Sequence, residues 1–182
     1  MKKVEKLFIL LIFLFIFAFL PYRLYTSRIS SSEVMQEQDG LLKDVSSEID
    51  EKKISKIELY YVPSYIQMGL ALTTQRLFTG RPLVITLTDN HKLKDISLAL
   101  RNTTPINKVV RSDIRVGIIV YGQNGQKRLM VAVGRNGGAE INSSECVLKG
   151  RLYRVLVSIA EGDDYSGISF KQKVLKFYSK YL

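Results

Sequence analysis

The chain contains few of the residue types that carry out enzymatic chemistry. Its 182 residues include one cysteine, Cys146, and one histidine, His91. A nucleophilic cysteine or serine needs a neighbouring base, and a Cys/His metal site needs several such ligands. We therefore expect Cys146 to be a small buried side chain and His91 to lie on the surface. The sequence predicts no catalytic residue, no metal site and no cofactor.

Two short segments have the composition of ligand-binding loops but not the spacing. The segment GRNGG, residues 134–138, is followed neither by Lys-Ser or Lys-Thr nor by a helical pattern, so it predicts a turn and not a phosphate loop. The segment EGDDYSG, residues 161–167, groups three acidic residues. Calcium loops place their ligands at alternating positions, whereas Asp163 and Asp164 are adjacent and point apart. This segment therefore predicts a loop between two helices.

A pair of carboxylates is a remaining candidate for a catalytic site. Glycoside hydrolysis uses two carboxyl groups on either side of the bond that is cleaved. Glu58 with Asp113 or Glu140 is such a pair. The distance between these residues in space is not visible in the sequence, so this alternative stays open.

Basic residues with tyrosines among them are the main functional feature of the sequence. The residues that we expect to form a binding face are Arg115, Tyr121, Arg128, Met130, Arg151, Tyr153 and Arg154. Such a face suits lipid headgroups, an anionic envelope polymer or an acidic protein. Nucleic acid would be the first candidate in the cytosol, but outside the membrane it is an unlikely partner, except in DNA uptake or transfer. Scattered solvated charge is the plain alternative.

The element that must position this face is a hairpin around Asn124-Gly125. This dipeptide favours a two-residue turn between antiparallel strands. One face of the hairpin then carries only aliphatic side chains, and the other carries the mixed basic and apolar set. The predicted partners are Tyr121 with Arg128, Val120 with Leu129, Ile118 with Val131, and Val116 with Val133.

The remaining elements define the fold class. Alternating residues predict strands over residues 54–62 and 83–88, and shorter strands over residues 139–142 (an edge strand) and 146–148. Helical spacing predicts helices that begin at Asp89 or Asn90, near residue 152, and over the basic tail, residues 168–182. The chain is therefore predicted to be an α+β protein. Its antiparallel sheet has four or five strands with helices packed on one face, preceded by a single N-terminal transmembrane helix.

The N-terminal apolar segment predicts a membrane anchor. Residues 7–20 carry no charge, Lys2, Lys3 and Lys6 precede them, and Arg23 follows. As a helix, residues 7–22 span about 24 Å, which is short of a hydrocarbon core of about 30 Å. A cleaved leader needs small residues just after the apolar segment, and these are missing. A buried core helix would be apolar on one stripe only. An uncleaved signal anchor is therefore favoured.

Charge divides the chain into three parts. Residues 1–25 are expected to form a cytoplasmic stub and anchor. Residues 26–53 are expected to form an acidic tether, because residues 33–51 hold seven acidic residues and one lysine, a net charge of −6. Residues 54–182 are expected to form the extracytoplasmic α+β domain, and residues 52–182 carry a net charge of +12. The lysines before the anchor favour an N-terminus inside the cell.

These features favour a binding protein over an enzyme. We expect a single-pass protein of the inner membrane whose C-terminal domain, periplasmic or extracellular, binds an acidic protein partner. It would be either a subunit of an envelope complex or an immunity or inhibitor protein. The alternatives are an enzyme that acts on envelope polymers and a nucleic-acid-handling protein of an uptake or transfer system.

Overall fold

The computed structural model describes residues 32–63, 71–80, 82–108, 110 and 112–162. The predicted anchor, residues 7–22, and the predicted tail helix, residues 168–182, lie outside these ranges. Among the described residues, no helix has both the length and the apolar character needed to cross a bilayer. The chain divides into two compact units, residues 1–37 and 38–182. The fold given below is that of the second unit.

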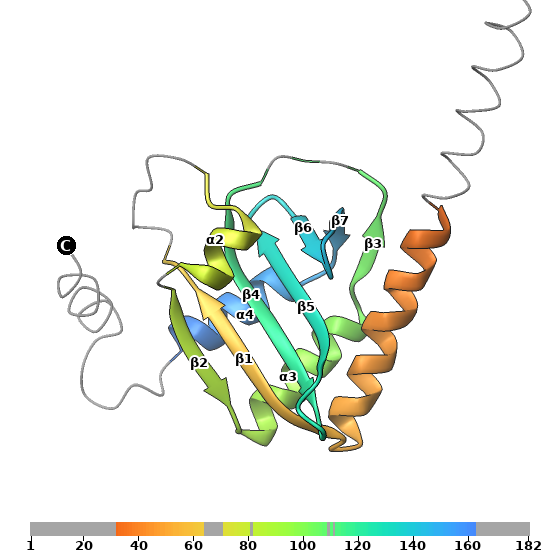
Figure 1. Ribbon diagram of the computed structural model, residues 1–182, viewed down its shortest axis with the longest axis vertical. Helices are drawn as coiled ribbons and strands as arrows, with labels where there is room; N and C mark the ends of the chain where they lie inside the picture. The colour runs from red at the N-terminus through yellow and green to blue at the C-terminus, as the bar shows by residue number, and fades with distance from the viewer. Residues whose placement is uncertain (1–31, 64–70, 81, 109, 111, 163–182) are drawn as a thin grey trace, which may run out of the picture. The chain divides into compact units, whose positions relative to one another are not determined.

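Four helices and seven strands make up the described structure (Figure 1). A helix over residues 32–50 crosses from the first unit into the second. The strands are β1 (Ile54–Tyr61), β2 (Leu83–Leu87), β3 (Thr104–Ile106), β4 (Ile114–Gly122), β5 (Lys127–Gly134), β6 (Gly138–Ile141) and β7 (Ser144–Lys149). The other helices are α2 (Thr74–Thr79), α3 (Asn90–Arg101) and α4 (Leu152–Glu161).

The strands form one antiparallel sheet in the order β2-β1-β4-β5-β6-β7-β3. An antiparallel sheet with helices confirms the α+β class, but the prediction of four or five strands was wrong. Strand β3 was not predicted because it has three residues, including Pro105, and lies at the edge where a proline is tolerated. Strand β6 was predicted to be an edge strand, but it lies between β5 and β7.

Local capping explains where α3 begins. The Asp89 carboxylate accepts the backbone N–H groups of His91 at 2.7 Å and Lys92 at 3.3 Å, so it caps the N-terminus of α3. Asn102 ends α3, and Gly162 ends α4. Both helices lie behind the sheet in Figure 1. The predicted start of α3 is confirmed.

The main core lies between the sheet and these helices. Alternate residues of β1, β4 and β5 point into it, and they include Ile57, Leu59, Ile118, Val120, Leu129 and Val131, all with no exposed surface. The helices add Ile96, Leu100 and Leu156, which are also fully buried. Removing these side chains from water is the main favourable contribution to folding.

Helix α2 packs on the opposite face of the sheet. Gly117 of β4 makes room for it, because a Cβ atom there would lie 2.8 Å from Phe78 Cζ and 3.0 Å from Leu77 Cδ2. The rings of Phe78 and Tyr60 meet edge to face, with their centroids 4.9 Å apart. Helices therefore lie on both faces of the sheet, and the prediction that they lie on one face was wrong.

Residues 38–50 pack against α3 and the sheet. Leu42, Val45 and Ile49 of this helix are buried. Its acidic residues pair with basic residues of the body: Asp50 binds Arg101 at 2.5 Å, and Glu48 binds Arg128. The segment that we expected to be a tether thus contributes a helix to the folded unit.

Candidate functional site

The β4–β5 hairpin turns through three residues and not the two predicted. The Gly125 N–H donates to Gly122 O at 2.9 Å, the Gly122 N–H donates to Gln126 O at 3.0 Å, and Gly125 has a φ of 76°. The extra loop residue pairs Tyr121 with Lys127, so the predicted partner Arg128 was wrong. A bulge at Arg128 then restores the register, and the predicted pairs from Val120–Leu129 to Val116–Val133 are confirmed.

Two of the predicted binding residues are held in ion pairs within the domain. The Arg128 guanidinium binds both carboxylate oxygens of Glu48, and this hydrogen bonding lowers the pKa of Glu48. Arg115 Nε donates to Asp113 Oδ2 at 2.6 Å, and the Arg115 side chain is 11% exposed. Both arginines therefore neutralise carboxylates of the same domain, and this reduces their electrostatic attraction for an external anion.

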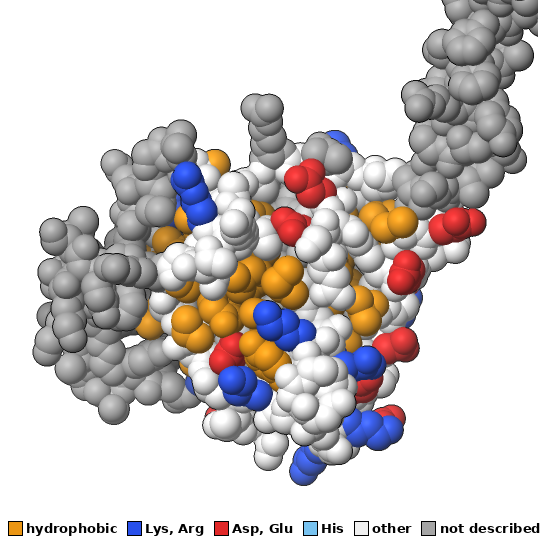
Figure 2. All heavy atoms as spheres, viewed as in Figure 1, with side chains coloured by type: hydrophobic (Ala, Val, Ile, Leu, Met, Phe, Trp, Pro, Cys, Tyr) orange, Lys and Arg blue, Asp and Glu red, His pale blue; other side chains and the backbone are white. Residues whose placement is uncertain are grey.

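Tyr121 and Met130 lie on the open face of the sheet, opposite α3 and α4. The Glu58 carboxylate organises this region, because it accepts hydrogen bonds from Tyr60 and Tyr121, each at 2.9 Å, and pairs with Lys56 at 2.7 Å. The Lys56 ammonium also lies 4.8 Å above the centre of the Tyr121 ring. Met130 is half-buried on the neighbouring strand. Apolar side chains gather over β1, β4 and β5 with basic side chains beside them (Figure 2).

The same contacts set the protonation of this cluster. The hydrogen bond from Lys56, and then those from Tyr60 and Tyr121, hold the pKa of Glu58 below its ordinary value. Burial and the bonds to Glu58 raise the pKa of both tyrosines. Glu58 is thus a fixed carboxylate at neutral pH. A general acid needs a raised pKa, which is the opposite shift.

The sheet also separates the carboxylates that were considered as a pair. Glu58 pairs with Ile119, six residues beyond Asp113, which at about 3.3 Å per residue puts the two acids roughly 20 Å apart along the strand. Glu140 lies on β6, three strands from β1, or about 14 Å across the sheet. Carboxyl groups that cleave glycosides lie about 5–9.5 Å apart. The backbone separation of each pair is larger than this range.

The cysteine and the histidine lie as the sequence suggests. Cys146 is 2% exposed, and burial raises the pKa of its thiol to about 11. His91 is exposed in the first turn of α3, with its Nδ1 atom 3.2 Å from Asp95. No cluster of three metal-binding side chains occurs in the described ranges.

The other three predicted residues lie at the start of α4. Arg151 is the N-cap residue, its side chain makes no capping hydrogen bond, and the first turn contains no acidic residue. Arg151 and Arg154 are exposed, and neither has an ion pair among the residues that the structure describes. Burial raises the pKa of the half-buried Tyr153, and the nearby Arg135 and Arg115 guanidinium groups oppose this shift.

Two hollows meet at these arginines. The smaller, of about 320 Å³, is lined by Arg135, Arg151 and Arg154 together with Tyr153. The larger, of about 900 Å³, is a groove between α3 and α4. Gly150, Arg151 and Arg154 line both. We call this combined region the α4 surface.

The groove of the α4 surface has apolar side chains. Leu98 of α3 is 55% exposed, and Val155 and Ile159 of α4 are half-buried beside it. Leu98 was not among the residues of the predicted binding face. The sequence feature that could have identified it is an apolar residue that lies outside the buried stripe formed by Ile96 and Leu100 on the same helix.

The predicted binding face is therefore divided. Arg115, Tyr121, Arg128 and Met130 lie on β4 and β5 and are largely engaged within the domain, whereas Arg151, Tyr153 and Arg154 belong to the α4 surface. Comparisons of this chain with protein-family models, curated proteins and solved structures gave no match.

Proposed function

We propose that this protein is a membrane-anchored, extracytoplasmic binding module, and that its α4 surface binds an acidic protein segment. The observation that carries the proposal is the groove between α3 and α4, in which the apolar side chains of Leu98, Val155 and Ile159 lie beside Arg151 and Arg154. A partner with acidic residues followed by apolar side chains is complementary to this arrangement.

The energetics support a protein partner over free anions. The exposed Leu98 side chain, with Val155 and Ile159 beside it, offers apolar area whose burial favours association. Arginine guanidinium groups bind carboxylates through paired hydrogen bonds and are enriched at protein interfaces. The body from residue 52 onward carries a net charge of +12, which speeds the approach of an acidic partner.

The location is proposed from the N-terminal sequence. Residues 7–22 would anchor the chain in the inner membrane with the N-terminus inside the cell, so that the α4 surface meets periplasmic or extracellular partners. A subunit of an envelope complex and an immunity or inhibitor protein both fit this arrangement.

A site-specific crosslinking experiment tests the proposal. A photoreactive amino acid is placed at Leu98 of the full-length chain in its native membrane, and at Val84 as a control on the opposite face of the sheet, where the side chain is 47% exposed. We expect one protein to crosslink at Leu98 and not at Val84. Raising the salt concentration should weaken its capture.

Matched charge variants make the test specific. The double variant Arg151→Gln/Arg154→Gln should lose the partner, whereas Arg76→Gln/Lys127→Gln, which removes the same charge from exposed positions elsewhere, should retain it. Capture that survives the first variant and high salt, or equal capture at Val84, would refute the proposal.

A further inference from the structure

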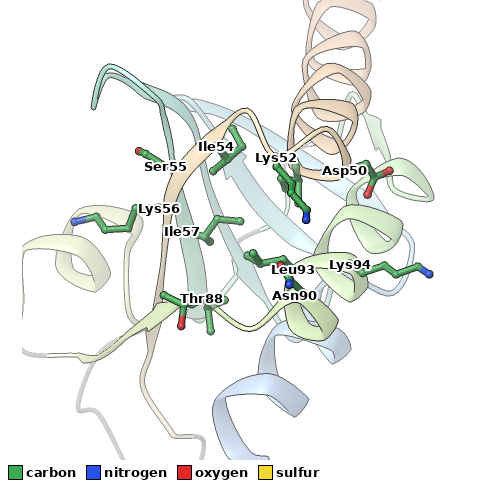
Figure 3. Close-up of a pocket in the computed structure, with 12 residues that line it drawn as sticks. Asp50, Lys52, Ile54, Ser55, Lys56, Ile57, Thr88, Asn90, Leu93 and Lys94 are labelled. Atoms are coloured by element: carbon green, nitrogen blue, oxygen red, sulfur yellow. The ribbon is translucent and has the colours of Figure 1, made fainter.

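A second cavity lies at a different place in the fold. It has a volume of about 660 Å³ and lies between the end of the helix over residues 32–50, the start of β1 and the start of α3 (Figure 3). Its apolar wall is formed by Ile49, Ile54, Ile57, Leu87 and Leu93. This volume is in the range of cavities that hold small molecules.

Lys52 extends across this cavity from an unusual backbone conformation. It follows the helix over residues 32–50 with a φ of 58°, in the left-handed region that favours glycine. Its N–H donates to Ile49 O at 3.1 Å, and the Lys53 N–H donates to Glu48 O at 2.9 Å, which together end the helix. In Figure 3 the Lys52 side chain points toward Asn90 and Leu93 of α3.

Three other polar side chains around the cavity are already engaged. Asp50 pairs with Arg101, and Lys56 points away from the cavity and pairs with Glu58. The Ser55 hydroxyl donates to Gly122 O at 2.6 Å. Lys52 and Lys94 line the cavity, and neither has an ion pair among the described residues. The Lys94 side chain extends away from Lys52 in Figure 3, so Lys52 is the residue that presents uncompensated positive charge above the apolar wall.

We propose that this cavity binds a small amphipathic anion, a carboxylate or phosphate joined to an aliphatic chain. The aliphatic chain lies against Ile49, Ile57 and Leu93, and Lys52 binds the anionic group. The N-terminus of α3 makes no contribution, because the Asp89 carboxylate already occupies it. The site is separate from the α4 surface and does not depend on the function proposed for that surface.

Methyl NMR of the full-length chain in phosphatidylcholine nanodiscs tests this site. Isoleucine methyl groups are labelled with ¹³C, and octanoate is added at concentrations at which it is monomeric. We expect saturable shifts at Ile49, Ile54 and Ile57. Octanamide, which has the same chain without the charge, should bind at least about tenfold more weakly, as expected for loss of a charge-assisted hydrogen bond.

Variants of the lysine complete the test. Lys52→Met keeps the length of the side chain and removes its charge, so it should weaken octanoate binding by about tenfold, while Lys52→Arg and the distant Lys127→Met should not. Nanodiscs with phosphatidic acid distinguish the source of the anion, because a lipid ligand would shift the same methyl groups without octanoate. Absence of shifts at these isoleucines in both kinds of nanodisc, or equal binding of octanamide and octanoate, would refute the proposal.

Discussion

Ser46 and Ser97 form a reciprocal pair of hydrogen bonds between two helices. Ser46 Oγ donates to Ser97 O at 2.9 Å, Ser97 Oγ donates to Ser46 O at 3.0 Å, and both side chains are buried. These small side chains let the helix over residues 32–50 approach α3 closely. The pair joins a segment of acidic sequence to the core of the domain.

Replacing both serines should show that they act together. Ser46→Ala and Ser97→Ala should each lower the free energy of unfolding by about 1 kcal/mol, because each removes one buried hydrogen bond. Ser97→Leu should cost more, about 1–3 kcal/mol, since a larger side chain separates the helices. Urea unfolding of the four combinations of the alanine changes gives the coupling energy. Strict additivity of the two alanine changes would contradict this account.

Two glycines should respond to alanine in opposite directions. Gly117→Ala should destabilise the protein by about 1–3 kcal/mol, because its Cβ atom would lie 2.7 Å from Val131 O and 2.8 Å from Phe78 Cζ. Gly40→Ala should stabilise it by up to about 1 kcal/mol, because Gly40 lies within a helix with nothing near its Cβ position. The change in thermal midpoint checks both signs.

Replacing Lys52 by glycine should raise the stability of the protein and weaken ligand binding. Lys52→Gly should raise the free energy of unfolding by about 0.5–1 kcal/mol, because a φ of 58° is unfavourable for lysine and accessible to glycine. The same variant should bind octanoate more weakly, since the ammonium group is lost. Denaturant unfolding and the NMR titration measure the two effects. An unchanged or lower stability would show that this backbone conformation is not strained.

Acid should weaken the Glu58 cluster. Because the pKa of Glu58 is lower in the folded protein than its ordinary value of 4.5, its contacts stabilise the fold above that pH. This contribution is lost as the pH falls through the lowered pKa. The free energy of unfolding should therefore fall more steeply below pH 4.5 in the wild type than in Glu58→Gln. Glu145→Gln, an exposed position on β7, should follow the wild type.

The thiol of Cys146 should react slowly in the folded protein. Burial raises its pKa to about 11, so little thiolate forms at pH 8, and access is limited by the surrounding side chains. We expect iodoacetamide to label it at a rate that increases by several orders of magnitude in 8 M urea. Fast labelling without denaturant would mean that β7 opens readily.

The sequence predicted elements where local pattern and burial coincide. The register from Val116–Val133 to Val120–Leu129 followed from two alternating aliphatic strands, since a shift by one residue would expose them. The start of α3 could be predicted from Asp89, because this capping residue lies within three residues of the backbone N–H groups that it binds. Strand β3 has no local signal, because its pairing with β7 joins residues some forty positions apart.

The binding face was harder to predict than the strands. Basic residues near one another in the sequence were taken to share a surface, but Arg128 binds Glu48, which is 80 residues away. Arg115 lies closer in the sequence to its partner Asp113, yet only the fold shows that the Arg115 side chain is largely shielded from solvent. A cation can be recognised as unpaired only when the acidic residues around it have been located. Of the arginines in the predicted binding face, this leaves Arg151 and Arg154 at the start of α4, within the part of the chain that the structure describes.

The strand order has a consequence for synthesis of the chain. Strand β1 needs β4 on its inner edge, but β4 begins sixty residues later, at Ile114, after β2, α3 and β3. A ribosome adding about 5–20 residues per second takes roughly 3–12 s to cover that interval. During that time one edge of β1 has no strand beside it, and unpaired edges invite aggregation. A chaperone that shields extended apolar segments of the nascent chain would be most useful in this interval, before the middle of the sheet has been made.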